Sequence, residues 1–213
     1  MKYKIHLVPI VIFLLTLIYF VAFRGRPLDP STASNSFAIA ATFVIGFCFL
    51  LGPLSRLRPH AFVHLLRYRK ALGLWGFLFA AIHVACAILL VYGLNILSAY
   101  NPSGENFWSI IAGTIAFIIF LVMTVTSRVK YIKSMGYEKW KRLQRTGYIA
   151  FFFVLIHFTI INGMSFVNRT LGQLLFAFVL FVLLLRVLII LMGKKEAYKP
   201  EEFHEVHEME PAQ

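Results

Sequence analysis

The chain has 213 residues, of which 60% are hydrophobic and 16% aromatic, while only 14% are charged. Apolar runs of about 20 residues, the length of a helix that crosses a bilayer, recur along it, so the sequence predicts a polytopic all-α membrane protein. Its net charge of +12 is concentrated in particular loops, which indicates membrane topology rather than nucleic-acid binding. The sequence contains no GxGxxG or P-loop pattern. From its composition and charge pattern we expect membrane lipid as a partner and no nucleic acid.

Six apolar runs are predicted to form a six-transmembrane-helix bundle. The first is preceded by lysines like a signal peptide, but it is too long for one and is followed by arginines, so we expect a retained anchor. Ser34, Asn35 and Ser36 are predicted to begin the second helix, because such residues favour the positions where helices start. The runs cover about 5–23, 36–54, 71–93, 107–126, 140–163 and 171–192.

The distribution of basic residues predicts the orientation of the bundle. Lys and Arg gather at the N-terminus, in the second and fourth loops and at the start of the tail, whereas the other loops hold only Arg24, Arg26 and Arg169. Because cytoplasmic loops carry the excess of Lys and Arg, we expect both termini in the cytoplasm. The sequence thus divides into a membrane domain, 1–193, and an acidic cytoplasmic tail, 194–213.

Two histidines stand deep within apolar runs, His83 in the third and His157 in the fifth. Ionisable residues inside a membrane are functional candidates by default. Counted from Ala71 and Leu143 at about 1.5 Å per residue, they lie about 18 Å and 21 Å into the membrane. Similar depth is what two axial ligands of one metal require, so the pair predicts a haem. The alternative is two separately hydrogen-bonded histidines in helix contacts.

Small residues accompany both histidines at helical spacing, Gly76 and Ala80 on one helix and Gly147 and Ala150 on the other. They either leave room for a flat macrocycle or serve close helix packing, which uses the same residue types. Arg186, in the sixth run, either extends its guanidinium to the membrane surface or pairs with an anionic group such as a haem propionate.

The chain contains four motifs, GPLSRLRP, RKALGLWGFLFAAIH, VMTVTS and WKRLQRTGYIAFFFVLIH. With these motifs it resembles the ferric reductase-like transmembrane domain family, and within it the haem-binding membrane subunits of the protein-methionine-sulfoxide reductase system. The resemblance implies that His83 and His157 are axial ligands of a b-type haem in a bacterial inner membrane. It also implies electrons from the quinone pool or a cytosolic flavin reductase, delivered to a periplasmic molybdopterin reductase subunit.

The sequence departs from that family at one position. Gln144 stands where the resemblance predicts a further haem-associated histidine, and the third helix offers Arg69 and Lys70 at the corresponding depth. An amide is a poor iron ligand beside imidazole, so we expect one haem per chain. A flavin mononucleotide or a quinone held near Gln144, Arg145 and Arg186 is then a candidate second carrier.

These observations predict an electron-transfer subunit without a catalytic domain of its own. Two histidine ligands close both axial positions of a haem, which suits electron carriage rather than oxygen binding. Two alternatives remain open at this point: a stand-alone ferric or cupric reductase that delivers electrons to periplasmic metal ions, and a non-redox membrane scaffold.

Overall fold

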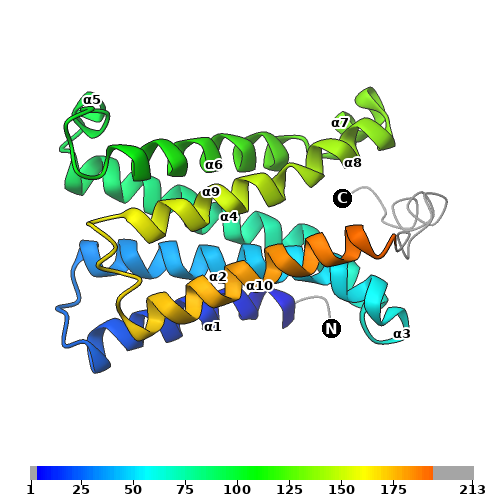
Figure 1. Cartoon of the computed structure of the whole chain (residues 1–213), viewed down its shortest axis with the longest axis horizontal. Coiled ribbons are helices and arrows are strands. Elements are labelled where there is room, and N and C mark those ends of the chain that lie inside the picture. Colours follow the sequence, from blue (N-terminus) through cyan, green and yellow to red (C-terminus); the bar gives the residue numbers. More distant parts are fainter. Residues whose placement is uncertain (1–3, 194–213) are drawn as a thin grey trace.

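The computed structural model describes residues 4–193, and in that part of the chain every regular element is a helix. The long helices lie side by side in an elongated bundle, with α5 at one end and α3, α7 and α8 at the other (Figure 1). The first described residues of α1 and the last of α10 lie at the same end, here called the α8 end. The elements are α1 (Lys4–Ile18), η1 (Tyr19–Phe23), α2 (Pro30–Leu57), α3 (Pro59–Phe62), η2 (Val63–Tyr68), α4 (Arg69–Cys86), η3 (Ala87–Val91), α5 (Ile96–Ala99), α6 (Phe107–Val125), α7 (Val129–Met135), α8 (Tyr137–Arg145), α9 (Gly147–Ile160) and α10 (Thr170–Leu191).

Six stretches of this bundle are long and apolar enough to cross a membrane. The third and fifth combine several elements, because α4 is preceded by α3 and η2 and extended by a π-helical turn, and α8 leads directly into α9. The predicted all-α, six-helix architecture is confirmed. The six stretches are Ile5–Phe23, Pro30–Leu57, Pro59–Leu90, Phe107–Val125, Tyr137–Ile160 and Thr170–Leu191.

The predicted start of the second helix is wrong: α2 begins at Pro30, six residues earlier than 36. Asp29 is the N-cap, and its side chain accepts a 2.7 Å hydrogen bond from the Thr32 backbone N–H. This bond lowers the pKa of the Asp29 carboxyl. Proline at the first helical position suits such a start, since it has no N–H to satisfy. Ser36 lies inside the helix, where its hydroxyl donates to the Thr32 carbonyl oxygen, a bond that makes serine compatible with a helix interior.

The core forms where α2 packs against α4 and α6 packs against α9, the two most extensive helix contacts. α1 and α10 flank α2, and α10 also contacts α9. One cluster of fully buried side chains joins Phe151 of α9 to Val179 and Val182 of α10. A second joins Val44 of α2 to Phe79 of α4. The bundle therefore has two helix pairs, each containing one of the predicted histidine helices.

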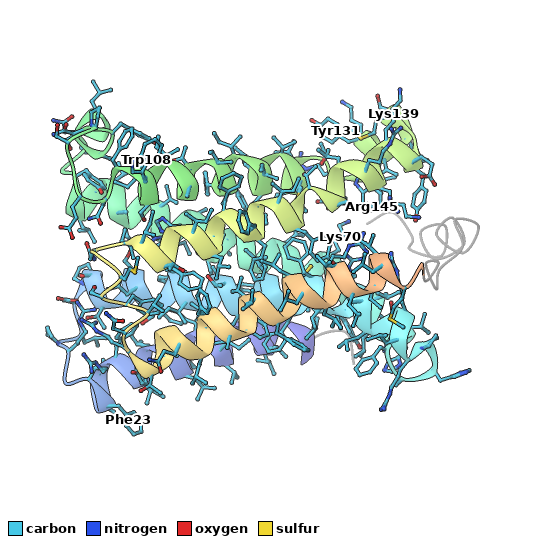
Figure 2. The ribbon with its side chains drawn as sticks, viewed as in Figure 1. Phe23, Lys70, Trp108, Tyr131, Lys139 and Arg145 are labelled. Carbon is cyan, nitrogen blue, oxygen red and sulfur yellow. The ribbon has the colours of Figure 1, made fainter. Side chains whose placement is uncertain are left out.

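The two ends of the bundle differ in the charge of their loops. The predicted basic loops are themselves partly helical, as α3 and η2 and as α7 and α8. Lys70, Lys139 and Arg145 lie at the α8 end, whereas Phe23 and Trp108 lie at the opposite end (Figure 2). The labelled basic residues thus lie at one end of the bundle, in agreement with the alternation of basic and less basic loops along the sequence. The predicted acidic tail lies outside the described residues.

Candidate metal centre

The structure brings the two predicted histidines together. His83 comes from α4 and His157 from α9, and their ring centroids are 6.5 Å apart with the ring planes at 66°. Both side chains are half-buried. The similar depths predicted from the sequence thus correspond to direct neighbours across the two helix pairs.

The His83 ring is fixed by α2, the partner helix of α4. Its Nδ1 lies 3.2 Å from the Ser34 carbonyl oxygen and 3.1 Å from the Ser34 hydroxyl. A carbonyl oxygen only accepts hydrogen bonds, so the contact assigns the ring proton to Nδ1. Nε2 is then the nitrogen with a free lone pair, the form in which imidazole binds a metal.

His157 is held in the same way by α6, the partner helix of α9. Its Nδ1 donates to the Ser109 carbonyl oxygen over 2.8 Å. The Ser109 hydroxyl lies 3.1 Å from the same nitrogen and donates to the His157 carbonyl oxygen over 2.9 Å. In the described part of the chain, neither histidine has a hydrogen bond at Nε2. Metal-binding histidines characteristically donate their second N–H to a carbonyl or carboxylate, which fixes the tautomer and the ring orientation.

A glycine on α6 makes room for the His157 ring. A Cβ added at Gly113 would lie 2.8 Å from Nδ1 and 3.1 Å from Cε1 of His157, closer than unbonded carbon atoms pack. Gly113, Ser34 and Ser109 were not among the predicted site residues. The one available signal was an isolated glycine within an apolar helix, which costs about 1 kcal/mol relative to alanine and therefore indicates a packing reason.

The predicted small residues Gly76 and Gly147 allow neighbouring helices to pack closely. A Cβ on Gly76 of α4 would lie 2.5 Å from Ile45 of α2, and one on Gly147 of α9 would lie 2.5 Å from the Phe49 ring. These glycines therefore allow close approach of helices. A role for them beside a cofactor stays a prediction, as it does for half-buried Ala80 and fully buried Ala150.

Two other predicted residues lie away from the histidine pair. Gln144 precedes His157 by 13 residues, about 20 Å along a helix, and its Nε2 donates to the Met123 carbonyl oxygen over 3.2 Å. The Arg186 guanidinium lies over the Tyr148 ring, 5.1 Å from its centroid. Both belong to the α8 end, so the structure does not bring Arg186 to the histidines.

The donor set at the centre is a pair of imidazoles. Within residues 4–193 there is no cluster of three or more His, Cys, Asp or Glu side chains able to hold a metal ion. Two imidazoles alone suit a metal whose other positions are filled by a non-protein ligand, because protein metal sites ordinarily supply three or four donors.

A family model described as "Ferric reductase like transmembrane component" matches residues 37–155 of the chain, more than half of it. The chain belongs to this family. The match includes His83 and ends two residues before His157. With six helices of membrane-spanning length and composition, this ferric reductase-like chain is a multi-pass membrane protein.

Several relatives share this region. Magnetosome protein MamZ of Magnetospirillum gryphiswaldense is 32% identical over 94 residues, which are 44% of this chain and 14% of MamZ. The protein-methionine-sulfoxide reductase heme-binding subunit MsrQ of Klebsiella pneumoniae is 29% identical over 132 residues, 61% of this chain and 64% of MsrQ. MsrQ of Brucella anthropi is 30% identical over 131 residues, 61% of this chain and 57% of MsrQ. The chain therefore spans less than two thirds of each of these relatives.

Proposed function

We propose that this protein is a membrane electron-transfer subunit that holds one b-type haem between His83 and His157. The observation that carries the proposal is the pair of neighbouring rings, each with its Nδ1–H donating to a backbone carbonyl oxygen and with no hydrogen-bond partner at Nε2 among residues 4–193.

The spacing of the rings fits a metal between them. A metal–imidazole bond is about 2 Å long, and the ring centre lies about 1 Å beyond the nitrogen, so two ligands on opposite sides of one metal have ring centres about 6 Å apart. The observed separation is 6.5 Å. Within residues 4–193 both Nε2 atoms lack a hydrogen-bond partner, which leaves them available to such a metal.

The residues of the site orient the ligands for electron carriage. The Ser34 and Ser109 carbonyl oxygens fix the tautomer of each imidazole and increase its basicity as a ligand. A bound haem supplies one-electron redox chemistry there. A haem held by both His83 and His157 would carry electrons rather than bind oxygen, because two imidazole ligands would leave small molecules no vacant coordination position.

The residues at the α8 end favour one haem per chain rather than two. Gln144 is engaged with the Met123 carbonyl oxygen, and Arg69 begins α4 at the same end. Neither an amide nor a guanidinium is a useful iron ligand. Electrons then reach the haem through another carrier, for which we propose a quinone or flavin mononucleotide near Gln144, Arg145 and Arg186.

The relatives suggest the electron acceptor. MsrQ is named as the heme-binding subunit of a protein-methionine-sulfoxide reductase. By that likeness we assign the chain to a bacterial inner membrane, with the α8 end and both termini cytoplasmic as the positive-inside rule predicts. The membrane domain 1–193 passes electrons from a quinol or a cytosolic flavin reductase to a periplasmic acceptor. The acceptor is a molybdopterin subunit that reduces methionine sulfoxide.

The test is spectroscopic. The protein is purified from cells with haem in excess, its haem is counted against its protein concentration, and reduced-minus-oxidised visible spectra are recorded through a redox titration. We expect one haem per chain, a low-spin spectrum and a single midpoint potential. A protein without haem would be the non-redox scaffold instead. Two haems with separate midpoints would contradict the single site and direct the ligand search to Gln144 or to His60 of α3 and His64 of η2, in the connector before α4.

A further inference from the structure

At the α8 end, three helices place two arginine side chains and a tyrosine close together. Tyr148 of α9 lies beside two guanidinium groups: Arg69 at the start of α4 and Arg186 of α10. None of these contacts belongs to the histidine pair. Arg69 and Arg186 are hereafter called the arginine cluster.

The members of the cluster are close to one another. A Cβ added at Gly52 of α2 would lie 3.8 Å from the Arg69 guanidinium carbon and 3.7 Å from the Tyr148 hydroxyl oxygen, so these two groups are neighbours. The Arg186 guanidinium lies over the Tyr148 ring at 5.1 Å. Arg69 Nε is fully buried and, within residues 4–193, has no hydrogen-bond partner. A buried N–H donor without an acceptor is costly, more so on a charged group.

The described residues hold little negative charge to balance the cluster. They contain three acidic side chains, and two of these, Asp29 and Glu105, lie in loops at the opposite end of the bundle (Figure 1). The third, Glu138, is exposed on α8 and forms no ion pair with Arg69 or Arg186. Like charges repel strongly where water is scarce, so an anion from outside this part of the chain would stabilise the cluster.

We propose that the arginine cluster binds a phosphate group, that of an anionic phospholipid headgroup. Guanidinium groups present planar pairs of N–H donors that match two phosphate oxygens, and Arg69 Nε is an unused donor of this kind. Arg69 is the first residue of α4, and Arg186 lies five residues before the end of α10. These positions are within about 8 Å of the helix ends, the level at which basic pockets between membrane helices bind lipid headgroups. The proposal does not depend on haem, and it leaves Gln144 and Arg145 for the second carrier proposed above.

The experiment measures binding of defined lipids to the full-length protein in detergent by native mass spectrometry. The probes are phosphatidylglycerol, zwitterionic phosphatidylcholine and inorganic phosphate. The variants are Arg69→Gln and Arg186→Gln, on two different helices. Lys139→Gln is the matched control, because it removes one positive charge at the same end from an exposed site on α8 (Figure 2). Size-exclusion profiles establish that each variant is folded.

We expect saturable binding of one phosphatidylglycerol with preference over phosphatidylcholine. Each arginine variant should weaken it at least tenfold, the loss expected when a charge-assisted hydrogen bond is removed, while Lys139→Gln leaves it unchanged. Saturable binding of inorganic phosphate with the same dependence on Arg69 and Arg186, and without lipid preference, would support the phosphate site and overturn its lipid assignment. Equal losses in all three variants, or no saturable binding of either anion, would overturn the site.

Discussion

Substitution of Gly113 by alanine tests how closely the histidine centre is packed. The added Cβ would lie 2.8 Å from His157 Nδ1, 3.1 Å from Cε1 and 3.2 Å from Cγ. To reach ordinary contact at 3.4 Å, the ring and the new methyl group must separate by about 0.6 Å. The ring cannot yield freely, because Nδ1 is held 2.8 Å from the Ser109 carbonyl oxygen.

Two effects of opposite sign compete in this variant. Overpacking costs about 1–3 kcal/mol, whereas alanine in place of glycine stabilises a helix by about 0.8–1.0 kcal/mol. We expect a net loss of about 1 kcal/mol, or about 2–4 °C in the thermal midpoint for a chain of this size. Displacement of the ring should also reduce haem occupancy or shift the spectrum towards high spin.

The matched control is Gly73→Ala on α4. Its added Cβ would meet only Cys48 Sγ, at 3.6 Å, which is an ordinary contact, so this variant should keep its haem and be as stable as the wild type or more so. Thermal unfolding of the haem-loaded proteins and their visible spectra give the comparison. If Gly113→Ala matched Gly73→Ala in both, the close packing of α6 against His157 would be refuted.

Three further predictions concern other parts of the molecule. Reporter fusions after Gln213 and within the loop at Ser103 should report cytoplasmic and periplasmic locations respectively, and a periplasmic C-terminal signal would contradict the proposed orientation. Asp29→Ala should lower the thermal midpoint because α2 loses its N-cap. Asp29→Asn should lower the midpoint much less, because asparagine also caps helices, and equal losses in the two variants would argue against the cap. Because the folded pKa of Asp29 is lowered, its stabilisation is present at neutral pH and lost as pH falls through the acid range. The wild type should therefore lose more stability than Asp29→Asn between pH 7 and pH 3, and parallel melting curves would contradict this.

The sequence predicted those features that follow from one-dimensional patterns. Length and hydropathy are enough to find six membrane helices, and counting residues from the helix entries placed His83 and His157 at similar depth. The 6.5 Å between their rings agrees with this similar depth, whereas their role as ligands of one haem stays a prediction. Loop charge likewise separated the two ends of the bundle.

The features that were missed depend on neighbouring helices. The groups that fix the histidines are the backbone carbonyls of Ser34 and Ser109, and every residue has a carbonyl, so no residue type marks them. Ser34 was interpreted as a helix start because serine favours caps, but Asp29 and Pro30 take that role. Gly76 illustrates the same limit, since only the structure shows that Ile45 occupies the space beside it.

The central claim, that one haem is held between two helices by two histidines, is tested most directly by the visible spectra of His83→Ala and His157→Ala. His60→Ala, in the connector before α4, is the control, since that histidine lies outside the centre. Protein amount in the membrane establishes that each variant inserts. We predict that each ligand variant loses its haem or becomes high-spin, while His60→Ala keeps the low-spin spectrum of the wild type. A low-spin spectrum retained by both His83→Ala and His157→Ala would contradict the assignment.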